Sequence, residues 1–380
     1  MRTETLPEDA PGTYVDYHPR PYYQPDPLPP EPRIDLPEGT RELLTETAYQ
    51  LGRVDGISST VDFAAVLYTT LIRMEAVESA RIEGADVEYQ DIAAFHTTRA
   101  DSETKPQQKD LREVLNYEEA LLYGIDRIEG GEEITLELIT TLHEMLLDGV
   151  RNEGDLVGEF RDHMVRLNSP NSATDPFIPP SETALDELMG SLEVYIQTDG
   201  EYHPLVDAAV IHYFFETVHP FSDGNGRLGR LLIILYLLAQ GYIESPYIYP
   251  SAYFNRHKVE YVETMRAVSE SGAWVDWIEF FLEGLRTQAA ESSDRTWALK
   301  ELQSEYEATY TGSTATDTFA RTLLEIPYFT ATDIVEELDV SRATAYSVIE
   351  NLENEGLIRE VTGNEWGREY KAVDVFDVLG

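Results

Sequence analysis

The sequence predicts a mainly helical protein with a small β-hairpin and a C-terminal winged helix-turn-helix domain. Apolar residues recur three and four positions apart along most of residues 40–290, which is the period of helices with one buried face. Residues 319–380 then follow the order helix, turn, helix, strand, turn, strand, which is typical of a winged helix-turn-helix.

The elements are expected in the following order. Residues 1–38 are rich in Pro and Tyr and predict an extended arm without regular structure. Residues 39–100 predict a segment of two or three helices. The core is expected over residues 101–295, with irregular chain and a short hairpin at 150–181 and helices at 182–198, 204–218, 225–240 and 255–290. Residues 296–318 predict a helix end and a small polar linker before the winged helix at 319–380.

The composition is that of a globular chain with an unusual charge. The 380 residues are 42% hydrophobic and 11% aromatic, which allows two or three domains with their own cores. There are 71 acidic and 28 basic residues, only five of them Lys, and the net charge is −43. Because the acids spread along the chain, they are not a separate acidic tail. We interpret them as a halophilic adaptation, in which salt screens the repulsion between carboxylates.

Several classes of protein and site are excluded. The chain has no Cys, so it has no disulfides, zinc–thiolate sites or thiol nucleophiles. His143 with Glu144, and His212 with Glu216, lack the H-E-x-x-H spacing and are interpreted as ordinary helical pairs. MRTETLPEDAPG does not resemble a secretory signal, and no apolar run approaches the roughly 20 residues that span a bilayer. We expect a cytoplasmic protein with no membrane partner.

The stretch HPFSDGNGRLGR, residues 219–230, predicts an anion site. Asp223-Gly224-Asn225-Gly226 is a tight turn into a helix, where backbone N–H groups and the helix N-terminus form a concave cradle for a phosphate. Arg227 and Arg230 lie three residues apart on the first turn, so both can reach the same anion. Two arginines oppose the helix dipole at this end, and a polyanionic ligand would offset that.

Two further side chains of the stretch add chemistry to the anion site. Asp223 can hold Mg²⁺ against phosphate oxygens, because Mg²⁺ usually takes one or two carboxylates plus the substrate. His219 has an ordinary pKa near 6.5 and can accept a proton near neutrality. The alternative is that each residue caps a helix, turns the chain or pairs with an acid. That alternative explains the residues singly, whereas a nucleotide site with a general base explains their order.

HPFSDGNGRLGR resembles the Fic-domain signature, H-P-F-x-D/E-G-N-G-R-x-x-R, at every defined position. The resemblance extends over about residues 10–290 and includes GEFR at 158–161, FIPP at 177–180, SAYF at 251–254 and WVDWIEFFLEGL at 274–285. It implies a Fic-type helical core with a β-hairpin flap. It also implies an ATP- and Mg²⁺-dependent enzyme that transfers AMP to a Ser, Thr or Tyr hydroxyl of a target protein.

The resemblance further implies a role for each matching residue. His219 would be the base, Phe221 would anchor the loop in the core, and Asp223 would bind Mg²⁺. The ATP and target contacts would come from Gly224, Asn225 and Gly226 in the phosphate cradle, Arg227 on the phosphates, Arg230 on the γ-phosphate, and Ile178, Pro179 and Pro180 of the flap, which would hold the target backbone by strand addition. Tyr253 and Asn255 are expected near the adenine.

The segment Ser79-Ala80-Arg81-Ile82-Glu83-Gly84 resembles the inhibitory motif of the family, S/T-x-x-x-E-G/N. Ser79 and Glu83 are four residues apart and share a helix face. The resemblance implies that Glu83 pairs with Arg230 and takes the γ-phosphate position, so that ATP binds unproductively. Two alternatives stay open, namely an ordinary surface glutamate and a glutamate that orients water for hydrolytic removal of AMP.

The sequence of the winged helix does not decide which partner it binds. Ser341 predicts the N-cap of its second helix, and Arg342, Thr344 and Tyr346 lie near the end that meets base edges in such domains. Residues 333–377, however, contain twelve acidic and four basic residues, so the positive charge that attracts DNA is missing. DNA contact, protein docking and a homodimer are all open. The rivals to an adenylyltransferase are a de-AMPylating phosphodiesterase and a nucleotide-sensing DNA-binding regulator.

Overall fold

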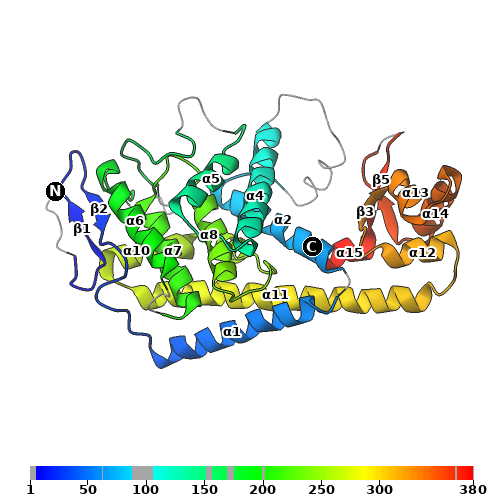
Figure 1. Cartoon of the computed structure of the whole chain (residues 1–380), viewed down its shortest axis with the longest axis horizontal. Coiled ribbons are helices and arrows are strands. Elements are labelled where there is room, and N and C mark those ends of the chain that lie inside the picture. The colour runs from blue at the N-terminus through cyan, green and yellow to red at the C-terminus, as the bar shows by residue number, and fades with distance from the viewer. Residues whose placement is uncertain are drawn as a thin grey trace.

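The computed structural model describes residues 6–61, 63–87, 106–150, 156–168, 175–198, 202–363 and 366–379. Helices dominate it, as predicted. Most of them form a broad core at one end, and a smaller domain lies at the other end of the long helix α11 (Trp274–Thr309) (Figure 1). Helix α1 (Glu38–Ser58) packs along α11. None of the described helices is long and apolar enough to cross a membrane.

The core is built around helix α8 (Asn225–Ala239), whose residues from 227 to 237 are all buried. A helix that is buried on every side must be surrounded by others, and α8 packs against α2, α4, α5 and α7. The remaining core helices are α2 (Ala64–Glu83), α4 (Pro106–Glu129), α5 (Leu136–Leu146), η1 (Glu182–Ala184), α6 (Leu185–Gln197), α7 (Pro204–Val218), α9 (Ser251–Arg256) and α10 (Lys258–Ser271). The N-terminus of α8, where the signature stretch lies, is therefore held rigidly.

Two helix predictions near the C-terminal end of the core need correction. The helix predicted over 255–290 is three helices, because the chain turns at His257 and again at Gly272, which has a left-handed φ of 68°. The linker predicted within 296–318 is shorter, because α11 continues to Thr309 and α12 (Ala315–Thr322) begins soon after. Thr314 caps α12 by accepting the N–H of Asp317 at 3.1 Å, so a small polar sequence here starts a helix.

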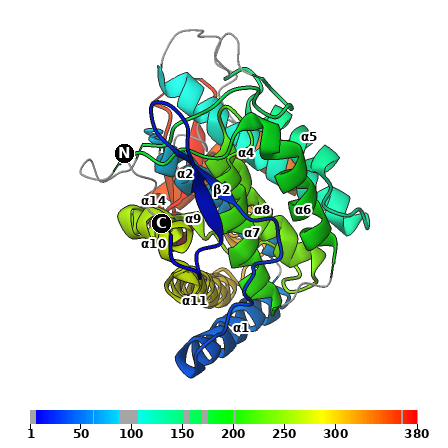
Figure 2. The same ribbon diagram turned by 90° about the vertical axis from the view of Figure 1, so that its left-hand side faces the viewer.

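The N-terminal arm is not without regular structure. Strands β1 (Gly12–Val15) and β2 (Tyr22–Pro25) form an antiparallel hairpin, seen in dark blue at the front of Figure 2. Tyr23 is fully buried and packs edge-on against Tyr14, with ring centroids 5.6 Å apart. Its N–H donates to the carbonyl of Ile178 at 2.8 Å. Burial of a tyrosine against the core therefore orders a proline-rich segment that composition alone describes as irregular.

The interval predicted as irregular chain with a short hairpin contains one isolated antiparallel bridge, between Leu167 and Phe177. Each of these residues donates its N–H to the carbonyl of the other, at 2.9 and 3.0 Å. The residues at 169–174, between the two paired positions, lie outside the described part of the chain.

The C-terminal domain has the predicted winged-helix plan and three additional elements. Its elements are α12, β3 (Tyr328–Thr330), α13 (Ala331–Leu338), α14 (Arg342–Glu355), β4 (Ile358–Glu360), β5 (Glu369–Ala372) and α15 (Val373–Leu379). The strands form an antiparallel sheet in the order β3-β5-β4. Helix α14 begins at the predicted N-cap, where Ser341 accepts the N–H of Thr344 at 3.2 Å. The domain contacts α11 through α12 and α15.

Candidate active site

His219 and the first turn of α8 are joined by a short loop with two left-handed residues. His219 follows the last residue of α7 with φ 50° and ψ 61°, which is an uncommon conformation for a residue with a side chain. Gly224, with φ 76°, then precedes α8. These two reversals bring the histidine and the N-terminus of α8 to the same end of the core.

The loop is held by side chains that point back into it. Asn225 accepts the N–H of Phe221 and donates to its carbonyl, both at 2.9 Å, and Phe221 is fully buried. His143 accepts the N–H of Gly158 on Nδ1 at 3.0 Å, so its Nε2 carries the proton donated to the carbonyl of Asp223 at 3.0 Å. The ring of His143 also stacks on Phe221. The side chain of Asn225, expected to line the cradle, is instead used to fold it.

The predicted anion cradle is open at the N-terminus of α8. The N–H groups of Asn225, Gly226 and Arg227 have no acceptor inside the helix. A Cβ at Gly226 would collide with Oε1 of Glu83 and would lie 2.8 Å from Nη1 of Arg230. The carboxylate of Glu83 therefore lies directly beside the first turn of α8, where a phosphate would approach.

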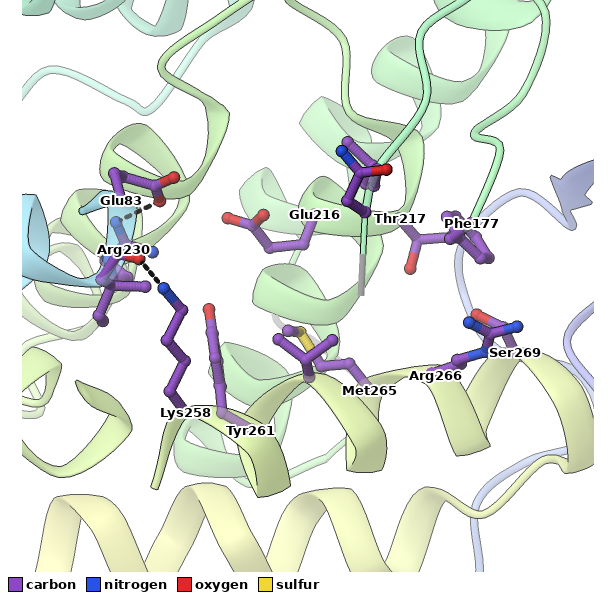
Figure 3. Close-up of a pocket in the computed structure, with 14 residues that line it drawn as sticks. Glu83, Phe177, Glu216, Thr217, Arg230, Lys258, Tyr261, Met265, Arg266 and Ser269 are labelled. Carbon is purple, nitrogen blue, oxygen red and sulfur yellow. Dashed lines mark hydrogen bonds and ion pairs between the residues drawn. The ribbon is translucent and has the colours of Figure 1, made fainter. Parts of the chain in front are cut away.

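Arg230 is bound by both residues of the predicted inhibitory motif. Its Nε donates to Oγ of Ser79 at 2.8 Å, and its Nη2 donates to the carbonyl of Ser79 at 3.0 Å and to Oε1 of Glu83 at 2.9 Å. The ion pair with Glu83 is visible at one end of the cavity in Figure 3. Burial raises the pKa of Glu83, but Arg230 more than offsets this, so the carboxylate stays ionised at neutral pH.

Arg227 lies three residues earlier on the same turn of α8 and has weaker partners. Its side chain is 3% exposed, and its ion pairs with Glu113 and Asp223 are 3.4 and 3.6 Å long. Its Nε and Nη1 are buried without a hydrogen-bond partner among the described residues. Since unpaired buried donors are costly, the arrangement favours an anionic ligand. Asp223 is half exposed, and one of its oxygens already accepts the N–H of Gly224 at 2.7 Å.

Burial keeps the imidazole of His219 in its neutral form. Burial lowers the pKa of His219 to about 4, with Arg161 adding to the effect and Glu83 opposing it. The imidazole is therefore neutral at pH 7 and can accept a proton. Its Nδ1 is buried without a partner among the described residues.

A cavity of about 360 Å³ opens beside Glu83 and Arg230. Besides these two, it is lined by Ile82, Leu167, Asn168, Phe177, Glu216, Thr217, Lys258, Tyr261, Val262, Met265, Arg266 and Ser269. Figure 3 shows Glu216 pointing into it from the side opposite α10. Burial raises the pKa of Glu216 to about 7, and its Oε1 has no described partner.

Tyr253 and Asn255, the residues predicted near the adenine, do not line this cavity. Asn255 donates to Oε2 of Glu78 at 2.8 Å, and the ring of Tyr253 stacks on His257. Neither lines the cavity, whose wall comes instead from α10 through residues such as Tyr261 and Met265. The SAYF segment forms the first four residues of α9. The helical period of α10 was the sequence signal that could have identified the residues facing the cavity.

The segment expected to bind the target backbone is already engaged within the chain. The carbonyl of Ile178 accepts the N–H of Tyr23, and the carbonyl of Pro180 accepts Nη2 of Arg161 at 2.6 Å. Pro179 and Pro180 have no N–H to donate. Strand addition at this edge would therefore have to displace the N-terminal hairpin.

Three family models match the chain. Residues 41–126 match the N-terminal domain of the Fic/DOC family, residues 133–237 match the Fic/DOC family itself, and residues 321–375 match the sugar-specific transcriptional regulator TrmB. The first match covers Ser79 to Gly84, the second covers the signature stretch, and the third covers the winged helix.

Curated proteins with similar sequences carry the name protein adenylyltransferase Fic. The chain is 30% identical to that of Aedes aegypti over 162 residues, which are 42% of this chain and 29% of the mosquito protein. It is 35% identical to that of Drosophila virilis over 133 residues, which are 34% of this chain and 25% of the fly protein. The chain thus spans less than a third of the length of these relatives.

Solved structures agree on the fold. A Fic family protein from Desulfovibrio desulfuricans superposes with a TM-score of 0.57 at 18% identity, over 90% of this chain and 98% of that one. A Fic domain containing signaling protein from Bacteroides thetaiotaomicron superposes with a TM-score of 0.50, also at 18% identity, over 68% of this chain and 95% of that one. Together these give a Fic-fold core.

Proposed function

Because the chain belongs to the Fic/DOC family, we propose that it is a protein adenylyltransferase, which transfers AMP from ATP to a Ser, Thr or Tyr hydroxyl of a target protein. One observation carries the proposal. A neutral histidine, whose Nδ1 has no hydrogen-bond partner among the described residues, lies at the same end of the core as the N-terminus of α8. On the first turn of α8, Nε and Nη1 of Arg227 also lack a described hydrogen-bond partner. This combination suits phosphoryl chemistry, in which positioning and charge stabilisation dominate.

In the proposed reaction, the target hydroxyl oxygen attacks the α-phosphorus of ATP and pyrophosphate leaves. His219 takes the hydroxyl proton, which balances the step. The N–H groups of Gly226 and Arg227, together with the Arg227 guanidinium, hold the phosphate oxygens. Arg230 holds the γ-phosphate when Glu83 releases it. The cavity along α10 would receive the nucleoside.

Asp223 would be the one protein carboxylate that binds Mg²⁺ at this site. The described residues contain no group of three His, Cys, Asp or Glu side chains that could hold a metal by themselves. Mg²⁺ does not need such a group, because one carboxylate and the substrate phosphates suffice. Asp223 is half exposed beside the cradle and keeps one oxygen free of described partners. The ion would neutralise charge on the phosphates.

We further propose that Glu83 is a brake on this activity. Its carboxylate and Ser79 together take three hydrogen bonds from Arg230, so the γ-phosphate site is filled from within the chain. Incubation with labelled ATP and Mg²⁺ tests both proposals. The Glu83→Gly variant should label itself or lysate proteins at least about tenfold faster than the wild type, since a charged hydrogen bond contributes about 1.5–3 kcal/mol.

Two controls accompany this experiment. Glu129→Gly changes the last residue of α4, an exposed position equivalent to Glu83 at the end of α2, and should leave labelling unchanged. His219→Ala in the Glu83→Gly chain should abolish labelling while ATP still binds. Label that persists without His219 would contradict its role as the base. Equal labelling of wild type and Glu83→Gly would contradict the role of Glu83 as a brake. Loss of label from a pre-modified target without net transfer would favour the phosphodiesterase.

A second function is supported by the winged helix, which matches a transcriptional regulator family. The N-terminal part of α14 exposes Arg342, Ala343 and Tyr346, in the region that meets the major groove in such domains. We propose weak DNA binding as an added property. Fluorescence polarisation with random duplex DNA tests it against Arg342→Glu, which should lower the affinity. Binding that is absent at 50 mM KCl would favour a protein partner for this surface.

We also propose a salt-rich native medium, on the strength of the net charge of −43. Molar KCl screens repulsion among the carboxylates, so the melting temperature should rise steadily with KCl. A melting temperature that is flat or falls between low and molar KCl would contradict this.

A further inference from the structure

Arg161, the arginine of the GEFR segment, is buried against main-chain carbonyls. Its residue is 2% exposed. Its Nε donates to the carbonyl of His219 at 2.8 Å, and its Nη1 donates to that of His163 at 2.8 Å. Its Nη2 donates to the carbonyls of Pro180 at 2.6 Å and of Val218 at 3.3 Å. Four of the five N–H groups of the guanidinium are thereby used.

The carbonyls that Arg161 binds belong to two parts of the site. Val218 and His219 are at the C-terminal end of α7, where carbonyls lack partners inside the helix. His163 and Pro180 flank the paired positions Leu167 and Phe177 of the flap hairpin. The backbone N–H of Arg161 adds a fifth bond, to the carbonyl of Pro220 at 2.9 Å. One side chain therefore joins both ends of the flap to the backbone on either side of the histidine.

This arrangement is unusual for a buried cation. Among the described residues, no carboxylate forms an ion pair with Arg161, and burial lowers its pKa to about 10, which the Glu182 carboxylate partly offsets. The guanidinium is still charged at neutral pH. A buried charge without a counter-ion is costly unless its donors are satisfied, and here carbonyls satisfy them. A planar fork reaches four carbonyls in different directions, which the point charge of lysine cannot do.

The hydrogen bond from Arg161 to the carbonyl of His219 stabilises a residue with a left-handed backbone conformation. His219 has a left-handed φ of 50°, which is unfavourable for a residue with a side chain and persists only where neighbours enforce it. Its N–H is held by the carbonyl of Phe215 at 2.9 Å, and its carbonyl is held by Arg161. The direction of the imidazole therefore depends on a residue in another segment of the chain.

We propose that Arg161 is a positioning residue, which sets the direction of the His219 imidazole and keeps the flap in register with it. The proposal rests on the proposed function for its kinetic part, because it concerns the base of that reaction. It does not place Arg161 in contact with ATP or the target.

The kinetic test uses Arg161→Ala and Arg161→Lys in the Glu83→Gly chain. A displaced base of about 1 Å can cost roughly 100-fold in rate, so self-labelling should fall by about that factor in Arg161→Ala. The Kd for ATP should be unchanged, because the cradle and Arg227 are intact. Guanidinium at millimolar concentration should restore part of the rate by filling the vacated site. Arg161→Lys should recover little. A loss shared equally between rate and ATP affinity, or no recovery with guanidinium, would overturn the proposal.

A matched control and a second readout separate this proposal from the proposed function. Arg295 is half buried on α11, over the ring of Tyr249, and Arg295→Ala should change neither the rate nor its response to guanidinium. The imidazole NMR signals of His219, assigned with His219→Asn, should shift in Arg161→Ala and return with guanidinium. Unmoved signals would overturn the positioning role whether or not the parent labels itself. Shifted signals with an inactive parent would support positioning while the proposed function fails.

Discussion

Arg227 and Arg230 are the same residue type on the same turn of α8, yet they are in opposite states. Both are almost fully buried, with side chains 3% and 1% exposed. Arg230 makes three hydrogen bonds to Ser79 and Glu83. Among the described residues, Arg227 makes two long ion pairs, and its Nε and Nη1 have no hydrogen-bond partner. One end of the phosphate cradle is therefore filled and the other is open.

The two arginines differ in their hydrogen-bond partners because of α2, since both lie on the same turn of α8 and are similarly buried. Helix α2 brings Ser79 and Glu83 to Arg230 only, and its own position depends on a buried carboxylate. Glu75 accepts the hydroxyl of Tyr117 and the N–H of Ser251, both at 3.0 Å, and also the Ser251 hydroxyl. The contacts of Glu75 thus anchor α2 about two turns before Glu83.

The largest expected effect is on ATP affinity when each arginine is replaced. In the wild-type chain, Arg227→Ala should weaken ATP binding about tenfold or more, since charged hydrogen bonds contribute about 1.5–3 kcal/mol. Arg230→Ala should change it little, because Arg230 is already engaged. In the Glu83→Gly chain, Arg227→Ala and Arg230→Ala should weaken ATP binding by similar factors. Isothermal titration calorimetry measures all six proteins, and equal losses in the wild-type background would show that Arg230 is free to bind phosphate.

A smaller effect is expected when only one contact of Arg230 is removed. Ser79→Ala deletes the Oγ acceptor of Nε and leaves the Glu83 pair intact. A typical hydrogen bond contributes about 1 kcal/mol, so self-labelling should rise about fivefold, well short of the Glu83→Gly rate. Ser58→Ala, at a buried serine of α1 whose Oγ has no described partner, is the matched control. An unchanged rate in Ser79→Ala would assign the whole brake to Glu83.

The smallest effect is expected from pH. Because Arg230 holds the pKa of Glu83 below its ordinary value, the pair stays charged from pH 6 to 8. His219, with a pKa of about 4, stays neutral over the same range. The ratio of Glu83→Gly to wild-type labelling should therefore be constant at pH 6, 7 and 8. A ratio that falls towards one at pH 6 would mean that the brake carboxylate takes up a proton there.

The parts of the site that follow from local sequence could be predicted. The turn chemistry of Asp223 to Gly226 predicts the start of α8, and helical spacing places Ser79 and Glu83 on one face. The winged helix was predictable for the same reason, because each of its helices carries its own cap and apolar stripe. In each case the signal lies within a few residues of the structure it determines.

The parts that depend on distant partners could not be predicted. His143 and Arg161 are 80 and 58 residues away from the loop carbonyls that they bind. The side chain of Asn225 accepts the N–H of Phe221 and does not face the cradle. The N-terminal arm forms a hairpin because Tyr23 is buried against Phe177. The hydrophobic periodicity of the sequence does not predict such contacts, because they form only when the core helices pack together.

The brake proposed for Glu83 has a consequence for how the protein would be controlled in solution, because its ion pair with Arg230 is internal to the chain. Since both residues belong to one chain, the blocking group is present at a fixed local concentration that dilution and expression level cannot change. A separate inhibitor protein would be lost by dilution, whereas this one competes with ATP in the same proportion in every molecule. Under the proposed brake, activation would require an event that moves α2 itself or a ligand that outcompetes Glu83 for Arg230.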